Sequence, residues 1–139
     1  LVPPLRESSM RTLPVRLVDA HWIVIGMPAT RVSPPLGPFE TWIVPKEHQA
    51  SFGLISMEDS KRFAKVLKTT LFKLYSKLNN PDYNYVIHTA PIKDEQEDYY
   101  HWHLQIIPRL TTPAGFEMGS GIYINVSFPE ETAQFLREG

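Results

Sequence analysis

Residues 99–109 contain the side chains of this sequence that are best placed for chemistry. In an extended strand, successive side chains point to opposite faces, so residues two apart share a face. The polar residues at that spacing are His101, His103 and Gln105. The apolar residues between them, which the same geometry turns to the opposite face, are Trp102, Leu104 and Ile106. The α-carbons of His101 and His103 would lie roughly 6.6 Å apart, so both imidazoles could reach one phosphate group or one metal ion.

Three interpretations of this histidine row are open from the residues alone. In the first, a neutral imidazole attacks a phosphorus atom and forms a covalent intermediate, while neighbouring imidazole and amide donors stabilise the phosphoryl oxygens. In the second, the row binds zinc or iron, for which the available further ligands are His48, His88 and Glu117. In the third, the row is a polar sheet face with satisfied histidines and no chemistry. Three polar side chains in register opposite an apolar row favour the first two interpretations.

The strands that must surround this row can be predicted from β-branched and aromatic runs between turn residues. Besides the histidine strand, they cover residues 21–25, 39–44, 83–88 and 122–126. In the third of these, Asn84 and His88 share one face. Prolines between residues 27 and 38 predict a loop there, because proline cannot donate to a sheet ladder.

One long helix is predicted between a Ser56 cap and the Asn-Asn-Pro sequence at residues 79–81. Its apolar residues at helical spacing, which should face the core, are Phe63, Val66, Leu67, Leu71, Leu74, Tyr75 and Leu78. A short helix is predicted over residues 130–137, after Pro129. Three glycines predict a shaped loop over residues 110–121. The first twenty residues are predicted to be a lead-in arm, which leaves one domain over residues 21–139.

Composition excludes several classes of protein. The chain has 14 Lys+Arg against 15 Asp+Glu, and the net charge of −1 gives no electrostatic case for a nucleic-acid partner. It contains no cysteine, which excludes a thiol nucleophile and a Cys-containing zinc site, and which is compatible with the cytoplasm, the compartment we expect. No run of about 18 apolar residues is present, so no membrane span is expected.

Four segments carry a resemblance to known proteins. HWHLQIIPR (residues 101–109) resembles the signature strand of the histidine-triad superfamily. The other three resemble the C-terminal half of the galactose-1-phosphate uridylyltransferase family and its sugar-nucleotide phosphorylase relatives. They are FETWIVPKEH (39–48), YVIHTAP (85–91) and TTPAGFEMGSGIYIN (111–125). The resemblance runs from about residue 21 to the end of the chain.

This resemblance implies an α+β fold, with a histidine-triad-like antiparallel sheet, one long helix and a short C-terminal helix. It also implies an enzyme of galactose or sugar-nucleotide metabolism. Such an enzyme transfers a nucleotidyl group between a nucleoside-diphosphate sugar, such as a UDP-sugar, and a sugar 1-phosphate, and the group is carried on a histidine between the two steps. The catalytic residues would be His103, at the middle-histidine position of the superfamily motif, with His101 and Gln105. As part of a C-terminal repeat, His103 would instead be a structural, metal-binding or substrate-contacting residue, because the family's nucleophile lies in the N-terminal repeat. The substrate-binding residues would be His88, Asn84, Arg109, Phe116 and Glu117. Zinc or iron at His48 and His101 would be the cofactor, with no organic cofactor.

Two departures from the family pattern bear on these expectations. Gln105 stands where many C-terminal repeats have a carboxylate, so the strand reads His-x-His-x-Gln, closer to the catalytic N-terminal repeat. The cysteine pair that completes a zinc site in some relatives is absent. Members usually hold two repeats in one chain, so a homodimer or a second repeat is the implied partner. The alternatives are a single-domain histidine-triad nucleotide hydrolase and a non-catalytic nucleotide-binding or dimerisation module. For Arg109 the alternative is a salt bridge at the strand end.

Overall fold

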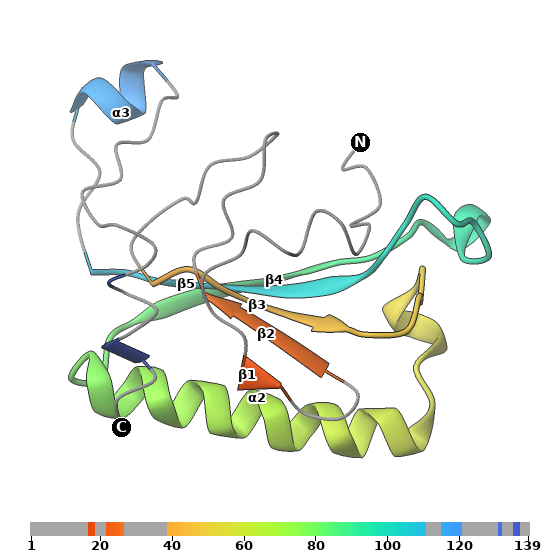
Figure 1. The fold of residues 1–139 in the computed structure, drawn as a ribbon. Helices are drawn as coiled ribbons and strands as arrows, with labels where there is room; N and C mark the ends of the chain where they lie inside the picture. The colour runs from red at the N-terminus through yellow and green to blue at the C-terminus, as the bar shows by residue number, and fades with distance from the viewer. Residues whose placement is uncertain are drawn as a thin grey trace.

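A five-stranded antiparallel sheet carries the histidine strand at an inner position. The structure, a computed structural model, describes residues 17–18, 22–26, 39–110, 115–120, 131 and 135–136. The sheet has the order β1-β2-β3-β5-β4. Its strands are β1 (Leu17–Val18), β2 (Trp22–Gly26), β3 (Thr41–Pro45), β4 (Tyr83–His88) and β5 (His103–Pro108). The predicted antiparallel α+β fold is thus confirmed, and three of the strands lie where the sequence predicted them (Figure 1).

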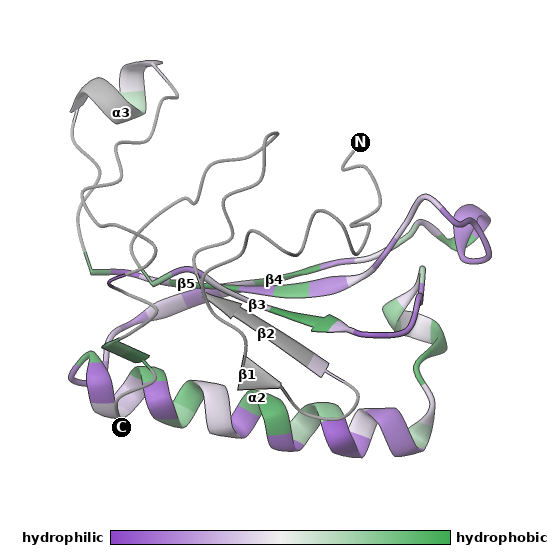
Figure 2. Ribbon diagram, viewed as in Figure 1, coloured by the Kyte–Doolittle hydropathy of each residue, from purple (hydrophilic) through white to green (hydrophobic). Residues whose placement is uncertain are grey.

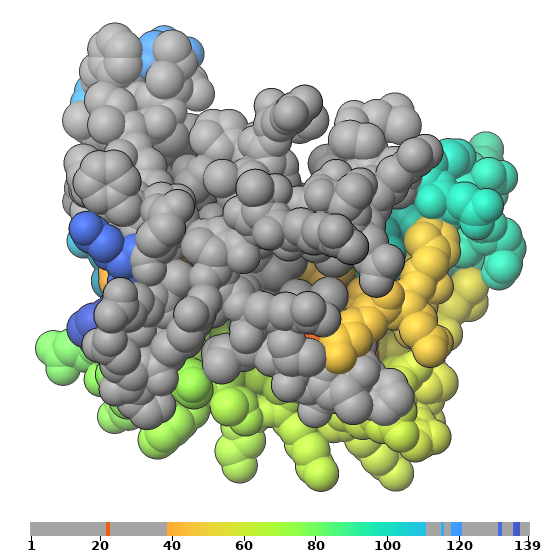
Figure 3. All heavy atoms as spheres, in the orientation of Figure 1, coloured from red at the N-terminus to blue at the C-terminus, as the bar shows by residue number. Residues whose placement is uncertain are grey.

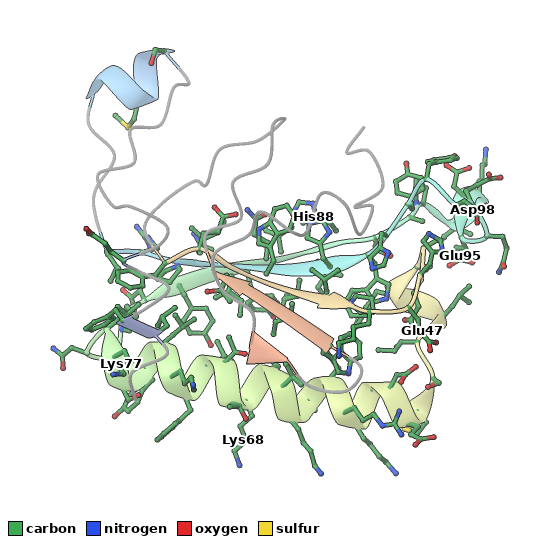
Figure 4. All side chains as sticks on the ribbon, viewed as in Figure 1. Glu47, Lys68, Lys77, His88, Glu95 and Asp98 are labelled. Atoms are coloured by element: carbon green, nitrogen blue, oxygen red, sulfur yellow. The ribbon has the colours of Figure 1, made fainter. Side chains whose placement is uncertain are left out.

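The alternation along β5 divides the sheet into two chemically different faces. The apolar face packs against helix α2 (Met57–Lys77), which runs beneath the sheet (Figure 1). The buried core between them combines side chains of the sheet, the helix and the C-terminal region: Trp22, Ile43, Phe63, Leu74, Trp102, Leu104, Ile106 and Leu136. The opposite face carries His103 and Gln105, as the period-two pattern predicted. His88 projects from this opposite face (Figure 4).

The position of helix α2 agrees with the apolar spacing and the Ser56 cap predicted from the sequence. Green and purple segments alternate along the helix (Figure 2), and of its apolar side chains Phe63 and Leu74 are buried in the core. The helix also forms one side of the space-filling surface (Figure 3). Most of the predicted apolar residues are buried or half-buried, but Tyr75 is 55% exposed and was wrongly placed in the core. In the part of the chain that the structure describes, no helix is long and apolar enough to cross a membrane.

The start of α2 gives a direct test of the predicted cap. The Ser56 hydroxyl accepts a hydrogen bond from the Asp59 backbone N–H at 3.0 Å. Replacing Ser56 with alanine is expected to lower the free energy of unfolding by about 1 kcal/mol, because one N–H of the first turn loses its acceptor. Urea unfolding followed by circular dichroism measures this loss. Ser60→Ala, inside the same helix, is the control and should change stability by less than about 0.5 kcal/mol; equal effects of both changes would contradict the cap.

Four predictions about the two ends of the chain have different outcomes. The loop predicted over residues 110–121 is wrong in part, because Gly115–Ser120 form a short helix, α3. Glycine disfavours helix by only about 1 kcal/mol per residue, so its presence does not exclude one turn. The strand predicted at 122–126, most of the helix at 130–137 and most of the 1–20 arm lie outside the described residues. Also described are the 3₁₀ turns η1 (Phe52–Leu54) and η2 (Ile92–Asp94).

Candidate functional site

The imidazole of His103 is enclosed between two other rings on the polar face of the sheet. Trp42 of β3 stacks on it with ring centroids 4.3 Å apart and an interplanar angle of 20°. His88 of β4 stacks on it at 4.6 Å and 18°. Because β3 and β4 flank β5 on opposite sides, the two rings approach the imidazole from opposite sides. The ring plane of His103 is therefore fixed by packing.

One backbone hydrogen bond determines which nitrogen of His103 is available. Its Nδ1 lies 3.3 Å from the carbonyl oxygen of His101. A carbonyl oxygen can only accept, so Nδ1 carries the proton and donates. In the neutral ring, Nε2 then keeps its lone pair. This is the protonation state that a nucleophile attacking phosphorus requires.

Burial keeps this imidazole neutral. His103 is 4% exposed, and desolvation lowers its pKa from 6.5 to about 4. The hydrogen bond to the His101 carbonyl raises the pKa, whereas the nearby imidazoles of His88 and His101 lower it further. Burial also lowers the pKa of His101. The hydrogen bond to the Pro45 carbonyl raises this pKa, and the nearby imidazole of His48 lowers it further. Both rings are thus uncharged at neutral pH.

These pKa shifts predict acid sensitivity of the folded chain. Between pH 6.5 and about 4 the unfolded chain binds a proton at His103 and the folded chain does not, so stability falls as the pH is lowered through this window. The expected loss is at most about 3–4 kcal/mol, from about 1.4 kcal/mol per pKa unit over the shift from 6.5 to about 4. Urea unfolding at several pH values measures it. Carboxylates also titrate there, so His103→Gln is the comparison; if its stability depends on pH as steeply as the wild type's, the prediction is wrong.

A hydrogen-bonded chain through the buried side chains of Gln105 and Glu40 connects the two rings that enclose His103. His88 Nε2 lies 2.7 Å from Gln105 Oε1, and Gln105 Nε2 donates to Glu40 Oε1 at 2.7 Å. Trp42 Nε1 donates to the same Glu40 oxygen, also at 2.7 Å. Sequence reasoning identified Gln105 and His88 but missed Glu40 and Trp42. The signal available was their spacing: two residues apart in a strand, they share a face, and a carboxyl in an otherwise apolar strand needs a buried partner.

His101 does not join the row in the way that strict alternation predicted. Strand β5 begins at His103, and the His101 ring instead places its Nε2 2.8 Å from the carbonyl oxygen of Pro45. Its ring meets that of His48 edge to face, with centroids 5.4 Å apart. His48 in turn bonds the carbonyl oxygen of Tyr100. His101 therefore pairs with His48, while His103 pairs with His88.

The pair His48 and His101 was predicted to hold a metal ion. The structure brings the two imidazoles together, and since each Nε2 donates to a carbonyl, each Nδ1 is left as an acceptor. Among the described residues, however, no group of three or more His, Cys, Asp or Glu side chains could hold a metal ion. Two imidazoles do not make a zinc site, which takes three or four protein ligands. The described residues therefore do not fit a metal centre.

The remaining predicted site residues belong to β4, to the end of β5 and to α3. Antiparallel partners point to the same side of a sheet, so Asn84, which pairs with Ile107, shares the face of His103. Asn84 and His88 are both exposed. Arg109 follows the end of β5 and is exposed; the ion pairs between described residues join Arg62 to Glu58 and Asp59, so none forms at Arg109 there. Phe116 and Glu117 belong to α3, and their side chains lie outside the described atoms.

The sheet, the long helix α2 and the histidine face define a protein of the histidine-triad fold. A Hit-like protein from Bartonella henselae superposes with a TM-score of 0.62 and 20% identity, covering 94% of this chain and 90% of that chain. At that identity the likeness establishes the fold only. No family model matches the chain.

Closer relatives identify the family. ADP-glucose phosphorylase from Arabidopsis thaliana is 46% identical over 103 residues, and galactose-1-phosphate uridylyltransferase from Thermotoga maritima is 36% identical over 110 residues. Each match covers 73% of this chain. The Arabidopsis phosphorylase structure with bound ADP-glucose superposes with a TM-score of 0.83 at 37% identity, over 95% of this chain. The chain belongs to the galactose-1-phosphate uridylyltransferase family.

The matched part is a fraction of each relative. The chain spans 29% of the Arabidopsis phosphorylase sequence and 34% of the Thermotoga uridylyltransferase. It covers 42% of the chain in the solved phosphorylase structure. The histidine-triad unit described above is thus one part of the longer relatives.

Proposed function

We propose that this chain is a sugar-nucleotide transferase unit in which His103 takes up a nucleotidyl group. The observation that carries the proposal is the state of His103 itself: a neutral ring, locked between Trp42 and His88, with Nδ1 bound to a backbone carbonyl and Nε2 left with its lone pair. Nucleophilic catalysis needs this combination of orientation and protonation state. The homology to an ADP-glucose phosphorylase and a uridylyltransferase supports the substrate class.

The proposed reaction has two balanced displacements. In the first, His103 Nε2 attacks the α-phosphorus of a nucleoside-diphosphate sugar, which is the phosphorus of the diphosphate that is bonded to the nucleoside. The bond from that phosphorus to the bridging oxygen breaks, and sugar 1-phosphate leaves. In the second, an oxygen of inorganic phosphate or of another sugar 1-phosphate attacks the same phosphorus, and the bond to Nε2 breaks. The products are a nucleoside diphosphate or a new nucleoside-diphosphate sugar, and free His103.

The surrounding residues have proposed roles in binding the substrate. Asn84 and His88 line the same sheet face as His103 and are exposed to an incoming ligand. Arg109, at the end of β5, would bind phosphate oxygens, which guanidinium groups recognise well. Phe116 and Glu117, in α3, are proposed sugar contacts on the strength of the family resemblance alone. His101 supports the site through its backbone carbonyl, which holds His103 Nδ1.

A second candidate function follows from the length of the relatives. Because the chain spans 29–42% of them, its histidine face could complete an active site whose nucleophile lies in another unit. In that case the chain would bind the nucleotide sugar without forming a covalent intermediate. The partner would be a second copy of this fold, in the same protein or in a dimer.

The test is product analysis with both nucleotides. The purified chain is incubated with ADP-glucose or UDP-glucose and inorganic phosphate, and products are separated by chromatography. Glucose 1-phosphate with an equal amount of nucleoside diphosphate is the expected result. Nucleoside monophosphate formed without phosphate would instead indicate a histidine-triad hydrolase, and tight binding without turnover would indicate the second candidate.

Two controls complete this test. Lys68→Ala is the matched control, because Lys68 is exposed on α2, on the side away from the histidine face, and should leave turnover unchanged (Figure 4). Metal analysis of the same preparation examines the zinc or iron expectation separately. One ion per chain that is lost in His48→Ala would show that further ligands complete the His48 and His101 pair.

A further inference from the structure

We propose that Glu40 is a positioning residue, whose single oxygen Oε1 fixes both rings around His103 and, through Gln105, holds His88 in the tautomer with the proton on Nε2. Its bearing on catalysis rests on the function proposed above. The tautomer of His88 is independent of that proposed function, because it follows from hydrogen bonds within the chain. Glu40 would act through Trp42 and Gln105, the two side chains that donate to its Oε1.

The Glu40 side chain is placed where water cannot substitute for it. Glu40 is 2% exposed, and its Oε1 accepts hydrogen bonds from Trp42 Nε1 and Gln105 Nε2, both at 2.7 Å. The indole N–H can only donate, and the oxygen of Glu40 that receives it must therefore be an acceptor. Phe39, just before Glu40, has a φ of 63°, a left-handed conformation that is unfavourable for phenylalanine. The backbone at the entry to β3 thus tolerates strain next to this carboxyl.

Glu40 removes the ambiguity of the Gln105 amide. The two ends of a glutamine amide have nearly the same shape, and hydrogen bonds alone decide which end faces which neighbour. If the amide were reversed, its oxygen would face the Glu40 acceptor oxygen and that bond would be lost, while its NH₂ would face His88 and require an Nε2 without a proton. With its NH₂ on Glu40, Gln105 presents Oε1 to His88, 2.7 Å from Nε2. His88 must therefore donate from Nε2, and its neutral ring keeps Nδ1 as an acceptor.

The same arrangement fixes the enclosure of His103 from both sides. Glu40 binds the Trp42 indole directly and the His88 imidazole through one intervening amide. These are the two rings that stack on His103 at 4.3 and 4.6 Å. Locking the supporting groups by hydrogen bonds is what holds a reactive side chain in its productive orientation. While neutral, His88 would also offer a ligand hydroxyl an acceptor at Nδ1, not a donor.

The experiment reads the tautomer of His88 directly. Long-range ¹H–¹⁵N NMR of the chain labelled with ¹⁵N-histidine distinguishes a protonated from an unprotonated ring nitrogen, and the His88 signals are assigned by their loss in His88→Asn. The wild type is expected to show the proton on Nε2 only, at a pH where the ring is neutral. Glu40→Leu and Gln105→Met, which remove either the acceptor or the amide, are expected to give a mixture of tautomers. Glu40→Gln, which keeps an acceptor oxygen, should restore the wild-type pattern.

The outcomes separate this inference from the proposed function. A wild-type His88 protonated on Nδ1, or an unchanged pattern in Gln105→Met, would overturn it even if the chain transfers nucleotides. Gln105→Met also answers the question should Glu40→Leu fail to fold, because it leaves the carboxyl in place. If the wild type turns over, Glu40→Leu should slow nucleotidyl transfer about 10- to 100-fold with little change in nucleotide binding, and Glu40→Gln should be close to the wild type. If the wild type does not turn over, the proposed function fails and the tautomer result still stands.

Discussion

Replacing His103 with glycine is expected to lower the rate of nucleotidyl transfer by about 10³-fold or more, because removing a nucleophile leaves only binding and electrostatic stabilisation. The direct measurement uses radiolabelled ADP-glucose or UDP-glucose in a single turnover, followed by denaturation. Phosphorus bonded to an imidazole is labile in acid and stable in base, so this stability pattern identifies the adduct. Wild-type chain should carry label with that pattern, and His103→Gly should carry none.

His101→Ala is the matched comparison for this change. The His101 ring bonds Pro45 and lies against His48, while its contribution to His103 is a backbone carbonyl that alanine retains. We therefore expect His101→Ala to keep the label. Label that persists in His103→Gly, or that disappears equally in both variants, would show that His103 is not the acceptor. Undiminished nucleotide binding without label in the wild type would support the second candidate function.

Truncating Trp102 to alanine is expected to have the largest effect on stability, about 3–5 kcal/mol. Trp102 is fully buried, and its ring contacts those of Trp22, Phe52 and Phe63 at centroid distances of 5.5, 4.9 and 5.5 Å. Its Nε1 also donates to Gln49 Oε1 at 3.0 Å. Truncation would leave a cavity at the junction of β5 and α2 and an amide without its donor.

Urea unfolding measures this loss as a lower midpoint with an unchanged m-value. Domains of this kind are stable by about 5–15 kcal/mol, so the variant would be close to unfolding at moderate temperature. Phe72→Ala is the control, since Phe72 lies on α2 and is 66% exposed; its expected effect is below about 0.5 kcal/mol. A Trp102→Ala loss of under 1 kcal/mol would contradict the core described here.

Local sequence determined the elements and their faces. The extent of α2 follows from apolar spacing and the Ser56 cap, and the division of β5 into a core face and a polar face follows from period-two geometry. These features depend on residues a few positions apart, so a sequence pattern contains them. The resemblance of residues 39–48, 85–91 and 111–125 to one family led to the same fold, and membership of that family is confirmed by the relatives.

Only the tertiary structure decided which polar side chains act together. Glu40 and Gln105 are 65 positions apart, and no local pattern pairs a carboxyl in one strand with an amide in another. The register of β3 and β4 on β5 brings Trp42 and His88 to the two sides of His103. The point at which β5 begins turns His101 away to Pro45 and His48. Strand pairing depends on the free energy of the whole sheet and core. The sequence of one strand therefore predicts which of its side chains share a face, but not which strands lie next to it.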